Sequence, residues 1–450
     1  MRHAVLWFSM LSAWTPGVAL AQTSLQIPLQ FDFINPGAKS LAMGGAFAGL
    51  ADDATASFAN PAGLRSLNAS ELSIELKGAS TDSLFLESGR LSGTILNEGT
   101  DIIQGPLFKS SPNSNTGVGF LAGVYAPSAY NHRLVFAGYR HELVRVDQSF
   151  LSNGVFQQAS GELTSRRDSP QQGDRSVSIT GYGVSGAFAV RQNLAVGAAL
   201  TFYHFSIDSV FTRYDIVGFL GPPNLNVVEG QSSQKGSDVS AAPTLGLIFD
   251  HKQTRFGLVY RHGATFEFTT HDGTAPVRES RFRVPDTFAF GSSISLQHGR
   301  NDPGLPPPSF LLLAVEVTYI TYSRLVSEFV SDQAVATGTQ ADFSIDDGTE
   351  VHVGAQYAMP RLRGTPRFRG GFWFDPDHSV HFSPVVTSPS ALDQLFNERL
   401  ATALSTGSSQ YHYTGGLGLT LARWMELNVG VDLSSRHHTV SASLVVSRNK

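Results

Sequence analysis

Apolar and polar residues alternate with a period of two in segments that are unusually long. In one of them Met425, Leu427, Val429, Val431 and Leu433 share a face, and the residues between them are polar or glycine. Such alternation predicts a strand with one apolar face. These segments run for about 10 to 17 residues, whereas globular strands average about 5 to 6 and a membrane crossing needs about 9 to 11. The pattern therefore predicts an all-β fold, a transmembrane antiparallel β-barrel whose closure removes exposed sheet edges.

The same alternation gives an expected strand count. We predict about fourteen strands, an even number that places both chain ends on the periplasmic side. Their approximate ranges are 70–79, 116–126, 133–149, 176–190, 194–211, 239–250, 254–270, 284–297, 309–325, 348–359, 366–375, 410–421, 424–434 and 438–447.

The connections between these segments support the barrel independently. Outer-membrane barrels alternate short periplasmic turns with longer extracellular loops. The short connections are 126–132, 191–193, 250–253, 298–308, 360–365 and 422–423. The long ones are 80–115, 150–175, 212–238, 271–283, 326–347 and 376–409, and 435–437 is the one short exception among them.

The composition fits a barrel that lies in lipid. Charged residues make up 15% of the chain, against about 25% in an average soluble protein. Cysteine is absent, so disulfides contribute nothing to stability. The net charge of -5 and the lack of basic clusters with interleaved aromatics argue against nucleic acid as a partner.

The first 69 residues are expected not to form barrel strands. Residues 1–21 are predicted to be a signal peptide, because an apolar run ends in Ala19-Leu20-Ala21 before Gln22. Residues 22–69 are predicted to form a plug, or hatch, inside the lumen, and 70–450 the barrel. The small residues and turn chemistry of 35–67 suit packing inside a barrel. The hatch residues singled out are Gly44, Gly45, Asp52, Asp53, Asn60 and Pro61. Asp52, Asp53 and Asn60 are expected to hold the plug by hydrogen bonds to wall residues.

Three stretches resemble the FadL-type family of hydrophobic-compound channels. They are GAKSLAMGGAF with ADDA and NPAGL in 37–64, VPDT from Val284, and FRGGFWFDP from Phe368. The resemblance implies a monomeric barrel of fourteen strands in the outer membrane of a Gram-negative bacterium, plugged by the N-terminal hatch. It also implies passive uptake of long-chain fatty acids or other hydrophobic molecules, which leave sideways through the barrel wall.

One further resemblance leaves an alternative function open, and the last residues depart from the usual pattern. PorV-like barrels of a secretion system look related and carry a similar N-terminal stretch, so a role as the outer-membrane partner of such a system is the alternative function. The chain also departs from many outer-membrane proteins because it ends in Ser447-Arg448-Asn449-Lys450 rather than in an aromatic residue. We interpret this tail as a short overhang after the last strand.

Ligand-binding residues are expected in two places. Apolar residues in two extracellular connections are candidates to capture the ligand: Phe219, Leu220 and Leu225 in 212–238, and Leu395, Phe396 and Leu400 in a predicted helix that follows Ser390. Alternation directs the following charged and polar residues into the lumen: Arg255, Arg261, Glu267, Glu316, Glu350, His352, Arg367, Arg369, Glu426 and Asp432. Of these, Arg261 or Arg369 could pair with a fatty-acid carboxylate. Pairing with other luminal charges or with the hatch is the alternative for these two guanidiniums.

No catalytic, metal-binding or cofactor site is predicted. His204 and Ser206 share one face of a strand, but no third member of a catalytic triad accompanies them. His437-His438 and 375–378 lack the spacing of metal ligands. The expected partners are hydrophobic small molecules and the lipid of the outer membrane.

Overall fold

The structure is a computed structural model of the chain. It describes residues 33–448 except 97–98, 128–132, 159–164, 219, 273–276, 298–306, 326–340 and 385–390. The predicted signal peptide therefore lies outside the described residues.

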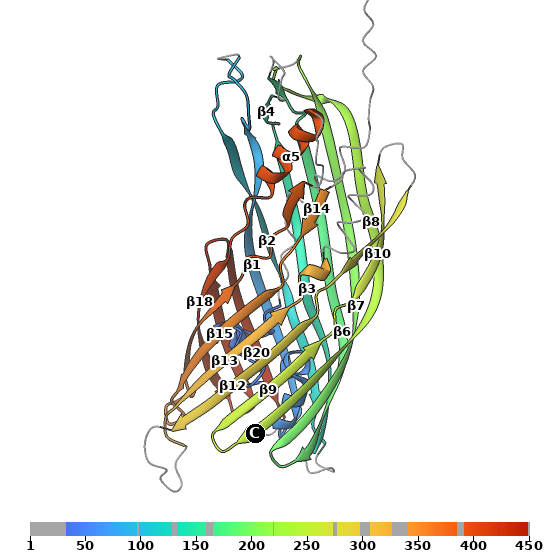
Figure 1. Ribbon diagram of the computed structural model, residues 1–450. Coiled ribbons are helices and arrows are strands. Elements are labelled where there is room, and N and C mark those ends of the chain that lie inside the picture. The colour runs from blue at the N-terminus through green and yellow to red at the C-terminus, as the bar shows by residue number, and fades with distance from the viewer. Residues whose placement is uncertain are drawn as a thin grey trace, which may run out of the picture.

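Fourteen antiparallel strands form a closed ring (Figure 1), as the sequence predicted. Each strand pairs with its neighbours in chain order, β1 pairs with β20, and pairing of β8 with β9 completes the circle. The ring consists of β1 Glu71–Gly89, β2 Pro106–Tyr125, β3 Leu134–Ser152, β6 Gln171–Arg191, β7 Leu194–Ile216, β8 Pro223–His251, β9 Thr254–Arg261, β12 Thr287–Gln297, β13 Phe310–Ile320, β15 Gly348–Ala358, β16 Arg367–Asp375, β18 Gln410–Ala422, β19 Met425–Leu433 and β20 His437–Ser447.

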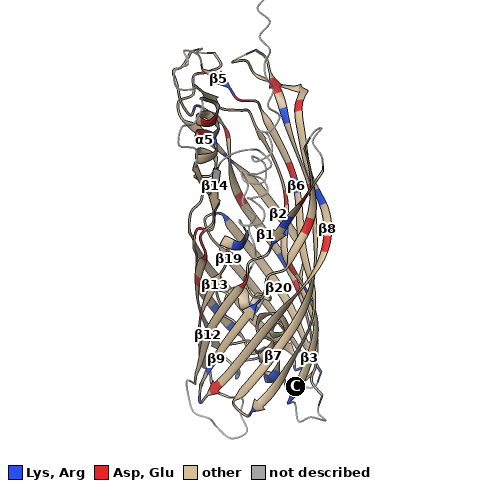
Figure 2. Ribbon diagram, turned by 45° about the vertical axis from the view of Figure 1, so that its right-hand side comes forward, with Lys and Arg blue, Asp and Glu red and all other residues tan. Residues whose placement is uncertain are grey.

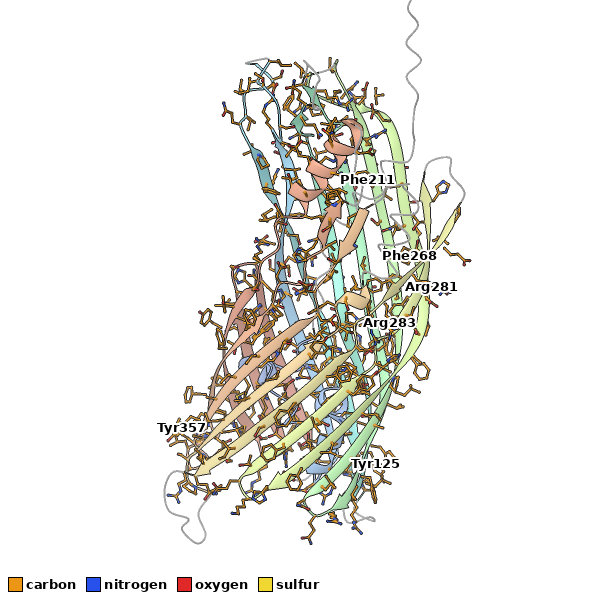
Figure 3. All side chains as sticks on the ribbon, viewed as in Figure 1. Tyr125, Phe211, Phe268, Arg281, Arg283 and Tyr357 are labelled. Atoms are coloured by element: carbon orange, nitrogen blue, oxygen red, sulfur yellow. The ribbon has the colours of Figure 1, made fainter. Side chains whose placement is uncertain are left out.

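The outer face of the ring carries a belt of exposed apolar side chains. Leu72, Leu76 and Val184 are more than half exposed, which is favourable only against lipid. Exposed aromatic side chains border the belt, as in other membrane barrels. Tyr125 and Tyr357 lie toward the lower end in Figure 3. None of the described helices is long and apolar enough to cross a membrane.

Above the belt the strands extend much further than the sequence indicated. Most segments predicted as long loops are antiparallel hairpins: β7 and β8, for example, remain paired as far as Ile216 and Pro223. Polar strand residues on both faces give no alternation there, so the pattern could not reveal them. The upper end also holds β4 Phe156–Gln157, β5 Arg166–Arg167, β14 Ala341–Ser344, β17 His381–Pro384 and α5 Ala391–Ala403 (Figure 1).

A kink divides the predicted strand 254–270 into β9 and β10 Thr265–Asp272. The strand that follows it in the chain is divided in the same way, into β11 Arg278–Arg283 and β12. A Cβ on Gly263 would lie 1.7 Å from the Val284 carbonyl oxygen, so only glycine fits this close crossing. The kink reverses which residues face inward. Phe266 and Phe268 are buried in the lumen, whereas Glu267 is exposed. The predicted inward position of Glu267 is therefore wrong, although Arg261, before the kink, does face inward.

Candidate functional site: the N-terminal segment and the lumen

The described N-terminal segment, residues 33–67, lies inside the lower half of the barrel (Figure 1). It contains α2 Ala38–Ala42, α3 Ala56–Ala59 and the 3-10 helix η2 Pro61–Ser66. We call these residues the hatch. Almost all of its side chains are buried, which fits the small-residue composition that suggested a plug.

Glycines on the inner wall allow the hatch backbone to lie directly against the strands. A Cβ on Gly354 would be 2.3 Å from the Met43 carbonyl oxygen, and one on Gly257 would be 2.1 Å from that of Ala48. Both contacts are shorter than any real Cβ shows, so a side chain would displace the hatch. An added Cβ would lie within 3.0 Å of a hatch atom at each of the following wall glycines: Gly197, Gly246, Gly257, Gly291, Gly354, Gly371, Gly416 and Gly430.

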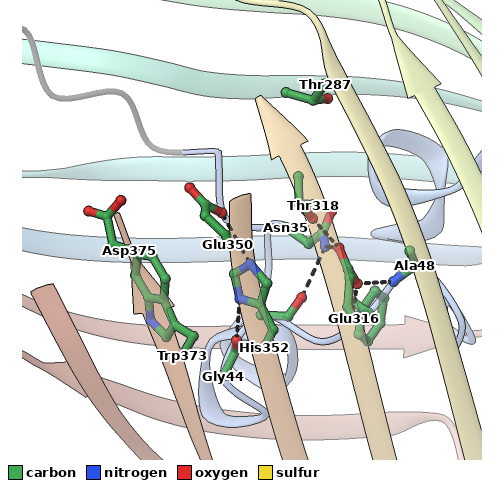
Figure 4. Close-up of polar contacts among 12 residues, drawn as sticks. Asn35, Gly44, Ala48, Thr287, Glu316, Thr318, Glu350, His352, Trp373 and Asp375 are labelled. Carbon is green, nitrogen blue, oxygen red and sulfur yellow. Dashed lines mark hydrogen bonds and ion pairs between the residues drawn. The ribbon is translucent and has the colours of Figure 1, made fainter. Parts of the chain in front are cut away.

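A buried carboxylate on β13 fixes the middle of the hatch. Glu316 Oε2 accepts hydrogen bonds from the backbone N–H groups of Phe47 (2.7 Å) and Ala48 (2.6 Å), and Oε1 accepts one from Asn35 Nδ2 (3.3 Å). Figure 4 shows these contacts converging on one side chain. Hydrogen bonds to a charged group are the strong kind, each worth about 1.5–3 kcal/mol. Glu316 was predicted to face inward, and its role as anchor is what the structure adds.

His352 on β15 forms a second anchor. Its Nδ1 lies 2.8 Å from the Gly44 carbonyl oxygen and its Nε2 lies 3.1 Å from Glu350 Oε2 (Figure 4). Both partners are acceptors when Glu350 is ionised, so the ring satisfies both when it carries a proton on each nitrogen. The ring also stacks on Trp373, with centroids 5.4 Å apart. Gly44 and Gly45 adopt positive φ angles of 65° and 79° at this turn, as their glycine pair suggested.

The polar hatch residues divide into two groups. Asn60 donates to the Ala48 carbonyl oxygen (2.8 Å) and to that of wall residue Leu247 (3.3 Å), and Pro61 begins η2 beside it. Asp52 and Asp53 were expected to bond the wall as well, but their hydrogen bonds run to Lys39 and Thr55 of the hatch itself. They brace the plug internally, whereas polar wall side chains such as Glu316 and His352 bind the backbone of the hatch.

Arg261 and Arg369 both have partners within the barrel. Arg261 donates to the Phe58 carbonyl oxygen (3.2 Å) and its guanidinium lies over the Phe58 ring at 4.2 Å. Arg369 donates to Gln356 Oε1 (2.7 Å) and Asn428 Oδ1 (2.6 Å). These contacts correspond to the structural alternative that the sequence left open. Binding of a ligand carboxylate by either residue stays a prediction.

A pocket of about 80 Å³ lies in the lumen above the hatch. Phe33 and Ile34 form part of its lining, Lys77 and Glu142 supply charge, and Tyr322, Trp373, His378 and His412 supply aromatic surface. The Tyr322 and His378 rings stack at 4.4 Å, and Trp373 and His412 at 3.7 Å. Since benzene occupies a cavity of about 150 Å³, even a small aromatic ligand needs the lining of this pocket to move.

His378, in the loop after β16, is the pocket residue with a marked electrostatic shift. Burial alone would lower its pKa. The interaction with Asp375, whose Oδ1 lies 3.3 Å from His378 Nδ1, and the hydrogen bond of Nδ1 to the Pro376 carbonyl oxygen (3.0 Å) outweigh burial and raise the pKa to about 9. The imidazolium is therefore the form present at neutral pH, and the pocket carries a cation beside its aromatic rings.

The wall beside this pocket is interrupted. The β2–β3 ladder runs only from Phe120–His141 to Tyr125–Phe136. Above it, the side chains of Asn113 and Asn115 donate to the Arg145 carbonyl oxygen at 3.3 and 2.8 Å in place of backbone pairs. The pocket is lined by residues on both sides of this break. Side-chain bonds can separate without unzipping a ladder, so the break is the weak place in the wall next to the pocket.

An apolar layer occupies the lumen above the hatch. Phe205 stacks on Phe266 and Phe282, with centroids 5.0 and 5.7 Å apart. The kink after Arg261 is what turns Phe266 inward. Leu400 of α5 is buried in the same cluster, so the cluster connects the upper end of the barrel with the lumen.

The predicted capture residues are only partly displayed. The helix expected after Ser390 is confirmed as α5, but Leu395 and Leu400 are buried and hold it in place. Leu225 is 47% exposed at the tip of the β7–β8 hairpin, and Leu220 is half-buried. Phe219 and the side chain of Phe396 lie outside the described residues. Ligand capture by these residues stays a prediction.

The candidate catalytic pair faces outward. His204 Nε2 lies 3.1 Å from Ser237 Oγ on the exposed side of the strands, away from the lumen. Within the described residues, no three His, Asp or Glu side chains are grouped so as to hold a metal ion.

Comparison with protein-family models and with curated proteins gives no match. Solved structures do match over nearly the whole chain. A Pseudomonas aeruginosa FadL homologue is 12% identical, with a TM-score of 0.55, and the match covers 94% of this chain and 99% of that one. The chain has the FadL-type barrel fold. The Pseudomonas putida toluene transporter TodX is also similar, at 12% identity, a TM-score of 0.50, and coverage of 93% and 99%. At this identity the likeness of the FadL-type fold concerns architecture alone.

Proposed function

We propose that the protein is an outer-membrane channel for the passive uptake of hydrophobic compounds, long-chain fatty acids or aromatic molecules among them. The supporting observation is that apolar surfaces follow one another down the barrel. From top to bottom they are the phenylalanine cluster of Phe205, Phe266 and Phe282, the aromatic pocket, and the hatch below it. A FadL homologue and a toluene transporter share this fold. The hatch fills the lower lumen, so the ligand cannot follow the barrel axis unless the hatch moves.

The proposed route runs from the upper loops through the phenylalanine cluster into the pocket. From there the ligand leaves sideways through the β2–β3 break, or past the hatch once its anchors release. Lateral release suits an apolar molecule, because it passes directly into lipid and avoids the cost of entering water.

Uptake into cells tests the proposal. Cells that express the protein should take up labelled oleate or labelled toluene faster than cells with an empty vector. A hatch variant lacking residues 22–67 should alter the rate and admit polar solutes. If the intact barrel accelerates neither compound, the proposal fails. Capture of a secreted protein from solubilised membranes, with no uptake, would favour the PorV-like alternative.

A further inference from the structure

Among the described residues, the turns at the lower end of the barrel carry more cations than acids. Figure 2 shows Lys and Arg at this end as well as higher on the barrel. Besides Arg361, six of those at the lower end are exposed and come from turns or strand ends spread around the ring, and we call these six the basic rim: Arg133, Arg191, Lys252, Arg363, Arg423 and Arg448. The chain as a whole is acidic, with a net charge of -5, so this concentration of positive charge is local.

The basic rim differs from the upper end in how its charges are balanced. At the upper end, several exposed cations have acidic partners: Arg281 pairs with Glu267 at 3.1 Å, and Arg145 with Asp147 at 3.5 Å. No ion pair links a rim cation to any carboxylate that the structure describes. The nearby Asp250 is already paired with Arg255 at 2.7 Å. Within the described part of the chain, the charge of the rim is therefore not balanced by an ion pair.

The height of the rim on the barrel identifies what supplies the counter-charge. Trp424, 51% exposed, adjoins Arg423, and Tyr357, 39% exposed, lies next to the last residue of β15, the strand before the turn of Arg363. Exposed Trp and Tyr mark the interface between hydrocarbon and head groups. Cations just beyond them have side chains long enough to lie along that interface. The rim is thus level with the phosphates of the adjoining leaflet.

We propose that the basic rim binds anionic phospholipids of the periplasmic leaflet through their phosphate groups. Five of its six members are arginine, whose planar guanidinium pairs phosphate oxygens through two hydrogen bonds. A ring of such sites attracts anionic lipid from all sides and fixes the depth of the barrel. The assignment of this end to the periplasm rests on the short turns and hence on the proposed outer-membrane location, but lipid binding is measured without any transported compound.

Trp424 provides a reporter inside the rim. The mature protein, reconstituted in vesicles, is titrated with brominated phosphatidylglycerol or brominated phosphatidylcholine, and bromine quenching of tryptophan gives the relative affinity. We expect a preference for phosphatidylglycerol of about threefold or more, because each basic residue attracts anionic lipid. The preference should shrink in high salt, where the Debye length falls to about 3 Å.

Two variants locate the effect. Changing the six rim residues to Gln should abolish the preference, whereas changing the upper-end cations Arg145, Lys235 and Arg281 to Gln should leave it intact. Retention of the heat-dependent shift in gel mobility shows that each barrel is folded. The proposal would be overturned if both lipids quenched the native protein equally. It would also be overturned if the preference for phosphatidylglycerol persisted in the variant with all six rim residues changed to Gln. If the rim instead binds an acidic periplasmic protein, the two lipids should quench the native protein equally.

Discussion

At the scale of single residues, the hatch depends on a few buried polar side chains. Glu316 binds two backbone N–H groups that have no strand partner. Glu316→Gln keeps the shape but removes the charge, so docking of the hatch should weaken by about 2 kcal/mol. Purified protein in planar bilayers should then show more frequent conducting events.

The control for this change is Glu267→Gln. Glu267 is 58% exposed and pairs with the exposed Arg281, and such surface pairs contribute about 0–1 kcal/mol. Its bilayer trace should match that of the native protein. A closed trace for Glu316→Gln as well would mean that the glycine contacts alone hold the hatch.

His378 gives a prediction for pH. Its folded pKa is about 9, above the usual value of about 6.5. A raised pKa stabilises the fold fully below about pH 6.5, and that contribution disappears as pH rises through about 9. Thermal melting at neutral and alkaline pH should show a loss of stability of at most about 3 kcal/mol. The loss should be smaller in His378→Gln, and an equal loss in both proteins would assign it to other groups.

At the scale of elements, the glycines of the inner wall determine how close the hatch can lie. A Cβ on Gly354 would meet the Met43 backbone at 2.3 Å, whereas one on Gly123, in β2, would meet nothing within 4 Å. Gly354→Val should therefore displace the hatch at a cost of about 1–3 kcal/mol, and Gly123→Val should not. Limited proteolysis of residues 35–67 distinguishes the two, and equal protection would contradict this account.

The kinked hairpin of β9–β12 predicts a specific pattern of thiol labelling. The chain has no cysteine, so single cysteines report cleanly. Glu267→Cys should react with a membrane-impermeant thiol reagent, whereas Phe268→Cys, buried in the lumen, should be protected. The reverse order would show that the strand continues straight through Gly263.

These elements also show how far the sequence could lead. Alternation predicted all fourteen ring strands and the inward direction of Arg261, Glu316 and His352, because lipid forces apolar residues outward on every strand. It failed after Gly263, where Phe266 and Phe268 are apolar but face the lumen. Periodicity identifies an apolar face and not what covers it.

The binding residues were harder to predict than the strands. A glycine recurs on the inward face of strand after strand, Gly354 and Gly430 among them, and that repetition was the one signal in the sequence for the contact surface of the hatch. Nothing comparable indicated the pocket. Its aromatic residues come from segments far apart in the chain, such as Tyr322 and His412, and only the closure of the barrel brings them together.

At the scale of the whole molecule, the lumen is closed, so a ligand can pass through it only if parts of the lining move. The pocket of about 80 Å³ is smaller than the space that benzene occupies in a cavity of about 150 Å³. Every proposed ligand must therefore displace part of the lining, either the hatch residues Phe33 and Ile34 or the side chains that bridge the β2–β3 break. Uptake should then be sensitive to any added volume at this point of the route.

Ala79 on β1 lines the pocket, and Ala79→Trp should fill it. We expect uptake of labelled toluene and oleate to fall by about tenfold, equivalent to about 1.4 kcal/mol. Leu76→Trp is the matched control, because Leu76 on the same strand is 56% exposed to the lipid side and an aromatic residue is tolerated there. Unchanged uptake in a folded Ala79→Trp protein would show that the ligand bypasses the pocket, whereas loss in both variants would show a general effect on β1.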